Sequence, residues 1–162
     1  MSTVVDRLRQ ITLFKQLKDD PGALAKVAAL IRTQAFPPGH CIIREGERGD
    51  AMYILNRGSV RVEKKTLAKD PFVVANLTDD MNAFFGEVAL MDDDLRSASV
   101  CALTRVECFV LRKRDFERLC ADNPKIGFYV VREIARSLAG RLRKTTADNA
   151  TLIAALIHVD EG

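Results

Sequence analysis

Apolar residues near the N-terminus recur with the spacing of an amphipathic helix. The positions that follow the 3.6-residue period are Val4, Val5, Leu8, Ile11 and Phe14. Asp20 followed by Pro21 is typical of a helix start, with the aspartate as cap and the proline at the first helical position. The Ala- and Leu-rich stretch from Gly22 to Arg32 favours another helix. We therefore expect residues 1–32 to form N-terminal helices.

The pattern changes after residue 32, where glycine and proline separate short apolar runs. The runs that we interpret as strands span residues 41–43, 52–55, 60–62, 72–77, 99–103 and 106–111. Short strands at intervals of about 8–12 residues, with turn residues between them, are typical of a sandwich, roll or barrel. Gly46 and Gly49 fit a tight corner within residues 45–50. Residues 33–112 are therefore expected to form a mainly β unit.

Helical patterns return in residues 113–162. Asp115 is placed to cap a short helix, and Asn123 followed by Pro124 predicts the start of a longer one. One apolar stripe on the longer helix consists of Ile126, Val130, Ile134, Leu138 and Leu142. Such a stripe is typical of a core-facing helix, or of a seam that pairs with a second copy. The pattern leaves both readings open, and Gly140 marks either close packing or a hinge.

The composition is that of an ordinary globular chain of 162 residues with a formal net charge of +3. The 25 basic residues nearly balance the 22 acidic ones, which argues against a nucleic-acid partner. No window is apolar over the roughly 20 residues that a membrane helix needs, and residues 1–6 do not resemble a signal peptide. We expect a soluble, cytoplasmic protein with no membrane partner.

Cysteine and histidine usage points away from metal binding and catalysis. The four cysteines, Cys41, Cys101, Cys108 and Cys120, form no CxxC pair and share no zinc spacing with histidine. We expect all four to be reduced, buried thiols. The two histidines lie far apart in sequence, and no nucleophile stands beside a base. We therefore expect no enzyme activity and no bound metal.

Residues 85–100 carry the polar groups that suit a phosphorylated ligand. Gly86 lets a ligand approach the backbone, and the residues after it fit one helical turn whose free N–H groups attract an anion. Arg96 supplies a charged fork for two phosphate oxygens, and Ser97 adds a hydroxyl donor. Glu87 is an acceptor suited to a sugar hydroxyl. Each feature alone is also typical of surface charges and turns, so the residues by themselves leave phosphate binding open.

The full string in this segment resembles a known motif. The segment reads FGEVAL, then MDDDL, then RSA. This resembles the phosphate-binding cassette of the cyclic-nucleotide-binding domain family, whose pattern is F-G-E-x-A-L, a short variable loop and R-x-A. Upstream, PPGHCIIREGERGDAMYILNRGSVRV resembles the glycine-punctuated roll of the same family, which includes catabolite activator protein and protein kinase A regulatory subunits. The resemblance covers about residues 10–145. It implies an antiparallel β roll or jelly roll of about eight strands, with N-terminal helices and a C-terminal helical lid ending in a long helix.

The resemblance also implies a role for each residue of the cassette. Glu87 accepts the ribose 2′-hydroxyl, and Arg96 pairs with the phosphate oxygens. The other ligand-binding positions that it implies are Phe85, Gly86, Val88, Ala89, Ser97 and Ala98. Serine at position 97 favours cAMP over cGMP as the ligand, and no further cofactor is implied. Base contacts are expected from the C-terminal helix, where the candidates are Arg141, Thr145 and Thr146.

Two departures from the motif leave an alternative function open. Leu95 stands where many members have proline, and three carboxylates, Asp92, Asp93 and Asp94, occupy the variable loop. They form a solvated loop tip, or they face the pocket and there repel an anionic ligand or restrain Arg96. Opposite charges a few Å apart interact by about 4 kcal/mol at an effective dielectric near 20. The alternative is a dimerisation or interaction scaffold of the same fold with a degenerate or repurposed pocket.

The expected mechanism is a population shift, in which the ligand stabilises one docking of the C-terminal helices over the roll. The apolar residues 150–159 need the body or a partner to cover them, so we expect a homodimer through the last helix as one possibility. Bacterial transcription factors of the family add a helix-turn-helix after this helix, and the chain leaves no room for one before Gly162. We expect a sensor without a DNA-binding domain, acting alone or with a fused or separate effector.

Overall fold

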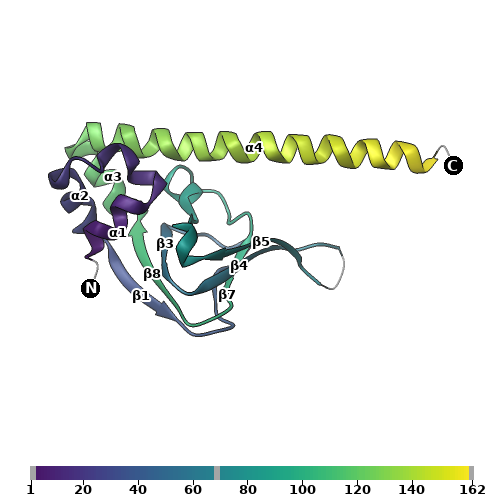
Figure 1. Ribbon diagram of the computed structural model, residues 1–162, viewed down its shortest axis with the longest axis horizontal. Coiled ribbons are helices and arrows are strands. Elements are labelled where there is room, and N and C mark those ends of the chain that lie inside the picture. The colour runs from purple at the N-terminus through teal and green to yellow at the C-terminus, as the bar shows by residue number, and fades with distance from the viewer. Residues whose placement is uncertain (1–2, 68–69, 161–162) are drawn as a thin grey trace.

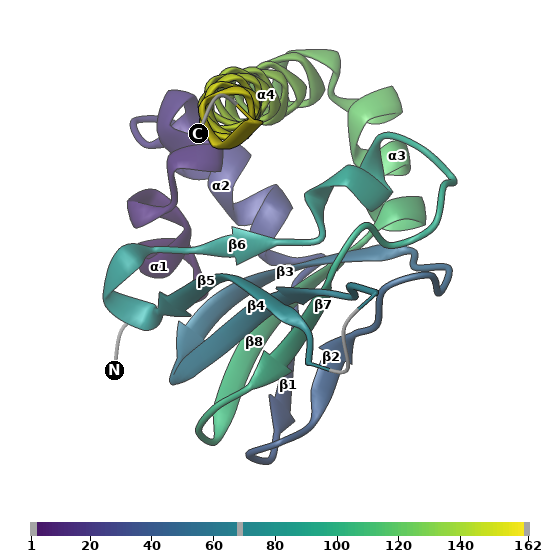
Figure 2. The same cartoon turned by 90° about the vertical axis from the view of Figure 1, so that its right-hand side faces the viewer.

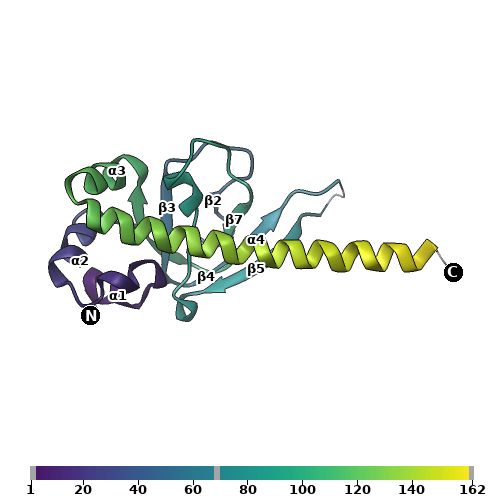
Figure 3. The same ribbon diagram turned by 90° about the horizontal axis from the view of Figure 1, so that it is seen from above.

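The computed structural model describes residues 3–67 and 70–160, with side chains as far as residue 157. Two four-stranded sheets face each other as a roll, and helices cover one end of it (Figure 1, Figure 2). Seen from above, the last helix crosses this end and continues well beyond the roll (Figure 3). The mainly β fold with flanking helices that the sequence predicts is confirmed.

The N-terminal segment forms three short helices. They are α1 (Val4–Gln10), the 3-10 helix η1 (Thr12–Leu17) and α2 (Pro21–Ala28). Thr3 and Asp6 exchange hydrogen bonds as a capping box at the start of α1. The Ala23 N–H donates to the Asp20 carboxylate at 2.9 Å, and Pro21 occupies the first position of α2, as predicted.

Eight strands form the roll. They are β1 (Arg32–Phe36), β2 (Cys41–Ile43), β3 (Ala51–Arg57), β4 (Ser59–Lys64), β5 (Phe72–Thr78), β6 (Phe84–Phe85), β7 (Ser99–Ala102) and β8 (Val106–Arg112). One sheet has the order β1-β8-β3-β6 and the other β2-β7-β4-β5, and all these pairings are antiparallel. The predicted runs fall in β2, β3, β4, β5, β7 and β8, with small differences at their ends.

Two strands, β1 and β6, have no clear signal in the sequence. β1 reads RTQAF, and only its last residue is buried, so no apolar run marks it. β6 consists of Phe84 and Phe85 alone and pairs with β3. This short pairing with β3 fixes the position of the backbone at the start of residues 85–100, the segment with the phosphate-binding pattern.

Two helices follow the roll. α3 spans Lys113–Asp122, and α4 spans Pro124–Asp160, which is 37 residues. The predicted start at Pro124 is confirmed. The expected cap at Asp115 is wrong, because Arg112 precedes the first helical residue and Asp115 lies within the first turn. Its charge there still favours the positive end of the helix dipole.

The residues of the predicted apolar stripe are buried at the start of α4 and exposed farther along it. Ile126, Val130 and Ile134 are buried in a cluster with the N-terminal helices and α3. Leu142, the last member of the stripe, is 68 % exposed. The apolar side chains near the end of α4, which were expected to pack on the body or on a partner, are not covered by the body: Leu152, Ile153, Leu156 and Ile157 are exposed. Within one copy of the chain, therefore, only the first half of α4 belongs to the core.

The expectation of four reduced cysteines is wrong for two of them. Cys41 on β2 and Cys101 on β7 form a disulfide, whereas Cys108 and Cys120 are free. The two bonded residues are direct partners in the β2–β7 ladder, which their sequence separation of 60 does not reveal. Among the described residues, no helix is long and apolar enough to cross a membrane, and no three metal-binding side chains come together.

Gly58 and Gly140 test opposite effects of the same substitution. Gly58 turns the chain between β3 and β4 with φ of +93°, and a Cβ there would overlap the Arg105 carbonyl oxygen. Gly140 lies inside α4, where a Cβ would meet only Arg143 at 4.0 Å, so it marks no close packing. We expect Gly58→Ala to lower the free energy of unfolding by at least about 2 kcal/mol. Gly140→Ala should raise it by about 0.5–1 kcal/mol. Urea unfolding measures both, and destabilisation by both substitutions would contradict the account.

Candidate functional site

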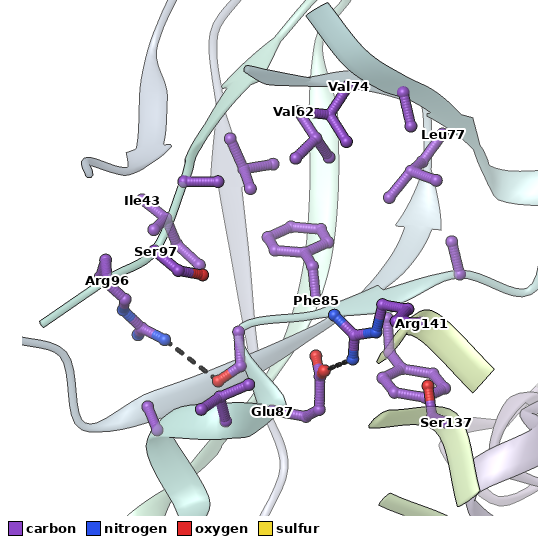
Figure 4. Close-up of a pocket in the computed structure, with 18 of the residues that line it drawn as sticks. Ile43, Val62, Val74, Leu77, Phe85, Glu87, Arg96, Ser97, Ser137 and Arg141 are labelled. Carbon is purple, nitrogen blue, oxygen red and sulfur yellow. Dashed lines mark hydrogen bonds and ion pairs between the residues drawn. The ribbon is translucent and has the colours of Figure 1, made fainter. Parts of the chain in front are cut away.

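A cavity of about 530 Å³ lies between the roll and α4 (Figure 4). Each cassette position that the resemblance implies lines it: Phe85, Gly86, Glu87, Val88, Ala89, Arg96, Ser97 and Ala98. Arg141 lines it from α4, and so does Ser137, one helical turn earlier, which sequence reasoning missed. Thr145 and Thr146 do not line the cavity and are exposed farther along α4.

The first half of the cassette is a tight turn into a short helix. β6 ends at Phe85, and Gly86 adopts a left-handed φ of +74°. The 3-10 helix η3 (Glu87–Leu90) follows, as the sequence predicts. A side chain at Gly86 would be strained by that φ and would lie 2.8 Å from Ile43 Cδ1 and 2.9 Å from Arg96 Nη1. Glycine therefore lets the guanidinium and the helix start share one corner of the cavity.

Arg96 is held by neutral partners. Its Nη1 donates to the Gly86 carbonyl oxygen at 3.0 Å and its Nη2 to the Ala51 carbonyl oxygen at 2.7 Å. The guanidinium crosses Gly49 so closely that a Cβ there would overlap it. Burial lowers the pKa of Arg96, although Tyr53 and Asp50 act in the opposite direction. Within the described part of the chain no ion pair satisfies this charge, so an anion in the cavity would be a stronger partner than either carbonyl.

The three aspartates of the variable loop do not act as a group. Lys113, at the start of α3, donates to the Asp93 carboxylate at 2.7 Å and to the Asp92 carbonyl oxygen at 2.9 Å. This hydrogen bond lowers the pKa of Asp93 and directs it away from the cavity, which it does not line. Asp94 accepts from the Leu95 N–H at 2.8 Å. Asp92 and Asp94 line the cavity, yet neither pairs with Arg96.

Glu87 is the buried carboxylate of the site and is paired from the helical lid. Its side chain is almost fully covered, and Arg141 of α4 donates to it (Figure 4). The Arg141 side chain itself is 56 % exposed, and partial burial lowers its pKa. Both residues were predicted to bind the ligand, but the contact between them was not predicted. The pair joins the cassette directly to α4.

One wall of the cavity is apolar. Its members come from strands of both sheets and include Ile43, Val62, Val74, Leu77 and Phe85 (Figure 4). The Phe85 ring stacks on Tyr53 with a centroid distance of 5.5 Å. Arg96 and Ser97 lie on one side of this wall, and Glu87 and Arg141 lie on another (Figure 4). The cavity therefore suits a ligand that combines an anionic group, a polar ring and an apolar or aromatic surface.

The chain matches the family model of the cyclic nucleotide-binding domain over residues 33–123. The chain belongs to the cyclic nucleotide-binding domain family. The structure of Thermus thermophilus catabolite activator protein aligns with a TM-score of 0.76 and 28% identity, over 87% of this chain and 62% of that one. The regulatory domain of Toxoplasma gondii PKA, from a co-crystal with cAMP, aligns with a TM-score of 0.69 and 26% identity, over 83% and 49% of the two chains.

Sequence relatives of this cyclic nucleotide-binding domain include larger proteins. A Drosophila melanogaster cGMP-dependent protein kinase is 34% identical over 119 residues, which are 73% of this chain and 15% of the kinase. A CRP-like cAMP-activated global transcriptional regulator from Mycobacterium tuberculosis is 31% identical over 136 residues, 83% of this chain and 57% of the regulator. The matches agree on a cyclic nucleotide-binding regulatory domain and differ in the nucleotide that they name.

Removing the lid arginine tests the buried pair without any ligand. We expect Arg141→Ala to lower the free energy of unfolding at pH 7 by about 1–3 kcal/mol, because Glu87 stays buried without its donor. Arg143→Ala, an exposed position on the same helix, is the control. Equal effects of the two substitutions in urea unfolding would contradict the pairing.

Proposed function

We propose that this domain is a sensor that binds cAMP in the cavity and passes the binding event to α4. The observation that carries the proposal is the state of Arg96, whose guanidinium is partly buried and, among the residues that the structure describes, is bonded to the Gly86 and Ala51 carbonyl oxygens and to no carboxylate. A phosphate placed beside it gains a charge-assisted, two-point contact that the carbonyls do not supply. The N–H groups at the start of η3 and the Ser97 hydroxyl lie around the same corner.

The rest of the ligand fits the remaining walls. With the phosphate at Arg96, the ribose would lie towards Glu87, whose carboxylate is an acceptor for a sugar hydroxyl. The base would then lie against the apolar wall or beneath α4, where Ser137 and Arg141 offer polar groups. Serine at position 97 is the feature of the resemblance that favours cAMP over cGMP, and relatives named for either nucleotide occur.

Coupling to the helices follows from the Glu87–Arg141 contact. A ribose hydroxyl competes with Arg141 for the same carboxylate, so a bound ligand changes how α4 is tied to the cassette. The ligand shifts the position of α4 only to the extent that it binds one docking more tightly than another. The first half of α4 is anchored in the core by Ile126, Val130 and Ile134, which leaves the part near Arg141 as the responsive segment.

A homodimer through α4 is the partner that we propose. One face of the helix carries residues at alternating steps of three and four: Phe128, Val131, Ala135, Leu138, Leu142, Thr145, Asn149, Leu152 and Leu156. This is the heptad spacing of a coiled coil, and it differs from the buried stripe through Ile134. Phe128, Leu142, Leu152 and Leu156 on this face are each at least 60 % exposed. Asn149 falls at an a position, where a single asparagine favours a parallel, in-register pair.

The scaffold alternative rests on the same helix but gives the cavity no role. Intact Glu87, Arg96 and Ser97 are the reason to prefer the sensor, since dimerisation alone does not need a partly buried guanidinium beside a cavity. The two functions separate cleanly in experiment. The sensor needs both nucleotide binding and a response of α4, whereas the scaffold needs only association.

Calorimetric titration with cAMP and cGMP tests the ligand. We expect cAMP to bind more tightly than cGMP, and Arg96→Ala to weaken cAMP binding by about 2–5 kcal/mol, or about 30-fold to several thousand-fold. Arg118→Ala, on the exposed face of α3, should bind like the wild type. Absence of heat with both nucleotides, or equal binding by the Arg96 and Arg118 variants, would favour the scaffold.

Neighbouring substitutions at the end of α4 test the dimer. Leu156 lies at an a position, while Ile157, similarly exposed, lies outside the seam. We expect Leu156→Asp to raise the dimer dissociation constant by about 100-fold or more, because each copy loses a buried leucine. Ile157→Asp should leave it nearly unchanged. Sedimentation equilibrium measures both, and a monomeric wild type or equal effects of the two variants would overturn the seam.

A further inference from the structure

The Cys41–Cys101 bond joins two strands that hold the ligand cavity. Cys41 starts β2, and Cys101 lies in β7, whose first residue, Ser99, comes two positions after the cassette residue Ser97. We propose that Cys41 and Cys101 are a reversible dithiol–disulfide pair, and that reducing it loosens the phosphate-binding cassette and weakens ligand binding. The effect on the ligand rests on the proposed function, whereas the effect on the cassette does not.

The register of the sheet brings the two sulfur atoms together. The Ala102 N–H donates to the His40 carbonyl oxygen at 2.8 Å, and the Gly39 N–H donates to the Ala102 carbonyl oxygen at 2.8 Å. These bonds lie next to the Cys41–Cys101 pair, on its His40–Ala102 side, and the two cysteines are directly opposed on antiparallel strands. Opposed side chains on such strands lie close together, so two cysteines there can form or open a bond with little change of the backbone.

β2 depends on this bond more than the other strands of the roll do. It has three residues, lies at the edge of its sheet and pairs with β7 alone. Its register with β7 is also irregular between Cys41 and Ile43. A short edge strand with few ladder hydrogen bonds opens locally at low cost. The disulfide is the covalent restraint that holds this strand in place.

The chain that follows β2 positions the second half of the cassette. The Glu45 N–H donates to the Ser99 hydroxyl at 3.0 Å. The Gly46 N–H donates to the Arg96 carbonyl oxygen at 2.9 Å, and the Arg96 N–H donates to the Glu47 carbonyl oxygen at 2.9 Å. The backbone of Arg96 is therefore held between two contacts from this segment. Freeing β2 releases the partner against which Arg96 is aligned.

The exposure of the two cysteines determines which sulfur atom a reductant attacks first. Cys101 is only 6 % exposed, whereas Cys41 is partly exposed, so a thiolate reaches Cys41 Sγ first. A dithiol reductant attacks Cys41 Sγ, forms a mixed disulfide there and expels Cys101 as a thiolate, which takes a proton. The second thiol of the reductant then closes its own disulfide and releases Cys41 as a thiol. Two electrons pass to the pair, and the reductant leaves as its disulfide; a low-molecular-weight disulfide reverses the exchange.

The Glu63 carboxylate lies close to one of the two sulfur atoms. Glu63 Oε1 lies 3.8 Å from Cys101 Sγ and is bound on its other side by Arg61. In the reduced protein this carboxylate is an acceptor for the Cys101 S–H group. The other two cysteines are poor competitors for exchange, since burial raises the pKa of Cys108 to about 12 and also raises the pKa of Cys120.

The test compares one protein in two redox states. Wild-type protein is equilibrated with glutathione disulfide or with dithiothreitol, and its thiols are counted by alkylation after denaturation. We expect two reactive thiols in the first state and four in the second. Reduction should speed hydrogen exchange in residues 41–47 and 96–101 and weaken cAMP binding about tenfold, because the ligand must then order the loosened segment. In hydrogen exchange and in cAMP affinity, Cys41→Ser should match the reduced state under both conditions, and Cys120→Ser should respond like the wild type.

The outcomes separate this inference from the proposed function. Four thiols after treatment with glutathione disulfide would overturn the pair. Equal exchange and equal cAMP affinity in the two states would overturn its control of the cassette and leave the proposed ligand standing. Faster exchange on reduction, with no cAMP binding in either state, would support the thiol control of the cassette and overturn only the proposed ligand.

Discussion

Arg96 places a positive charge in partly buried surroundings and gives it two neutral carbonyl oxygens as partners. Removing a guanidinium from water is unfavourable, and the direction of its pKa change reflects that cost. The rest of the site is arranged around this group. Gly49 and Gly86 leave space for it, and the segment after β2 fixes its backbone on both sides. An anion about 4 Å away would contribute about 4 kcal/mol at an effective dielectric near 20, which no carbonyl matches.

Helix α4 connects this charge to the outside of the molecule. Its first half is part of the core through Ile134 and its neighbours, and its middle reaches the cassette through Arg141 and Glu87. Its last part extends from the roll with Leu152 and Leu156 exposed (Figure 1). One continuous helix thus touches the core, the cavity and the surface proposed for a second copy. In the proposed sensor, a change at Glu87 would alter how the exposed part of α4 is held.

Sequence patterns predicted the parts of the fold that repeat regularly or carry turn residues. The apolar runs gave six of the eight strands, and Asp20-Pro21 and Pro124 marked two helix starts. β1 was not predicted because its side chains are mostly exposed and polar. β6 was not predicted because a strand of two residues is too short to show a periodic pattern. The cassette string identified eight of the residues that line the cavity, because this part of the lining comes from one short segment of the sequence.

Contacts between distant segments were the part that the sequence did not reveal. The Glu87–Arg141 pair depends on how α4 lies over the roll, and the Cys41–Cys101 bond depends on strand register. Ser137 was missed for the same reason, because only the docked helix shows which of its faces meets the cavity. The orientation of the Asp93 carboxylate away from the cavity likewise depends on its hydrogen bond from Lys113, a residue of the next helix.

A crystal structure of the protein grown with cAMP shows whether Arg96 binds the phosphate of a cyclic nucleotide, as we propose. We expect phosphate oxygens about 2.7–2.9 Å from the Arg96 guanidinium, with a ribose hydroxyl at the Glu87 carboxylate. A nucleotide bound elsewhere, or an empty cavity with Arg96 still bonded only to the Gly86 and Ala51 carbonyl oxygens, would contradict the proposal.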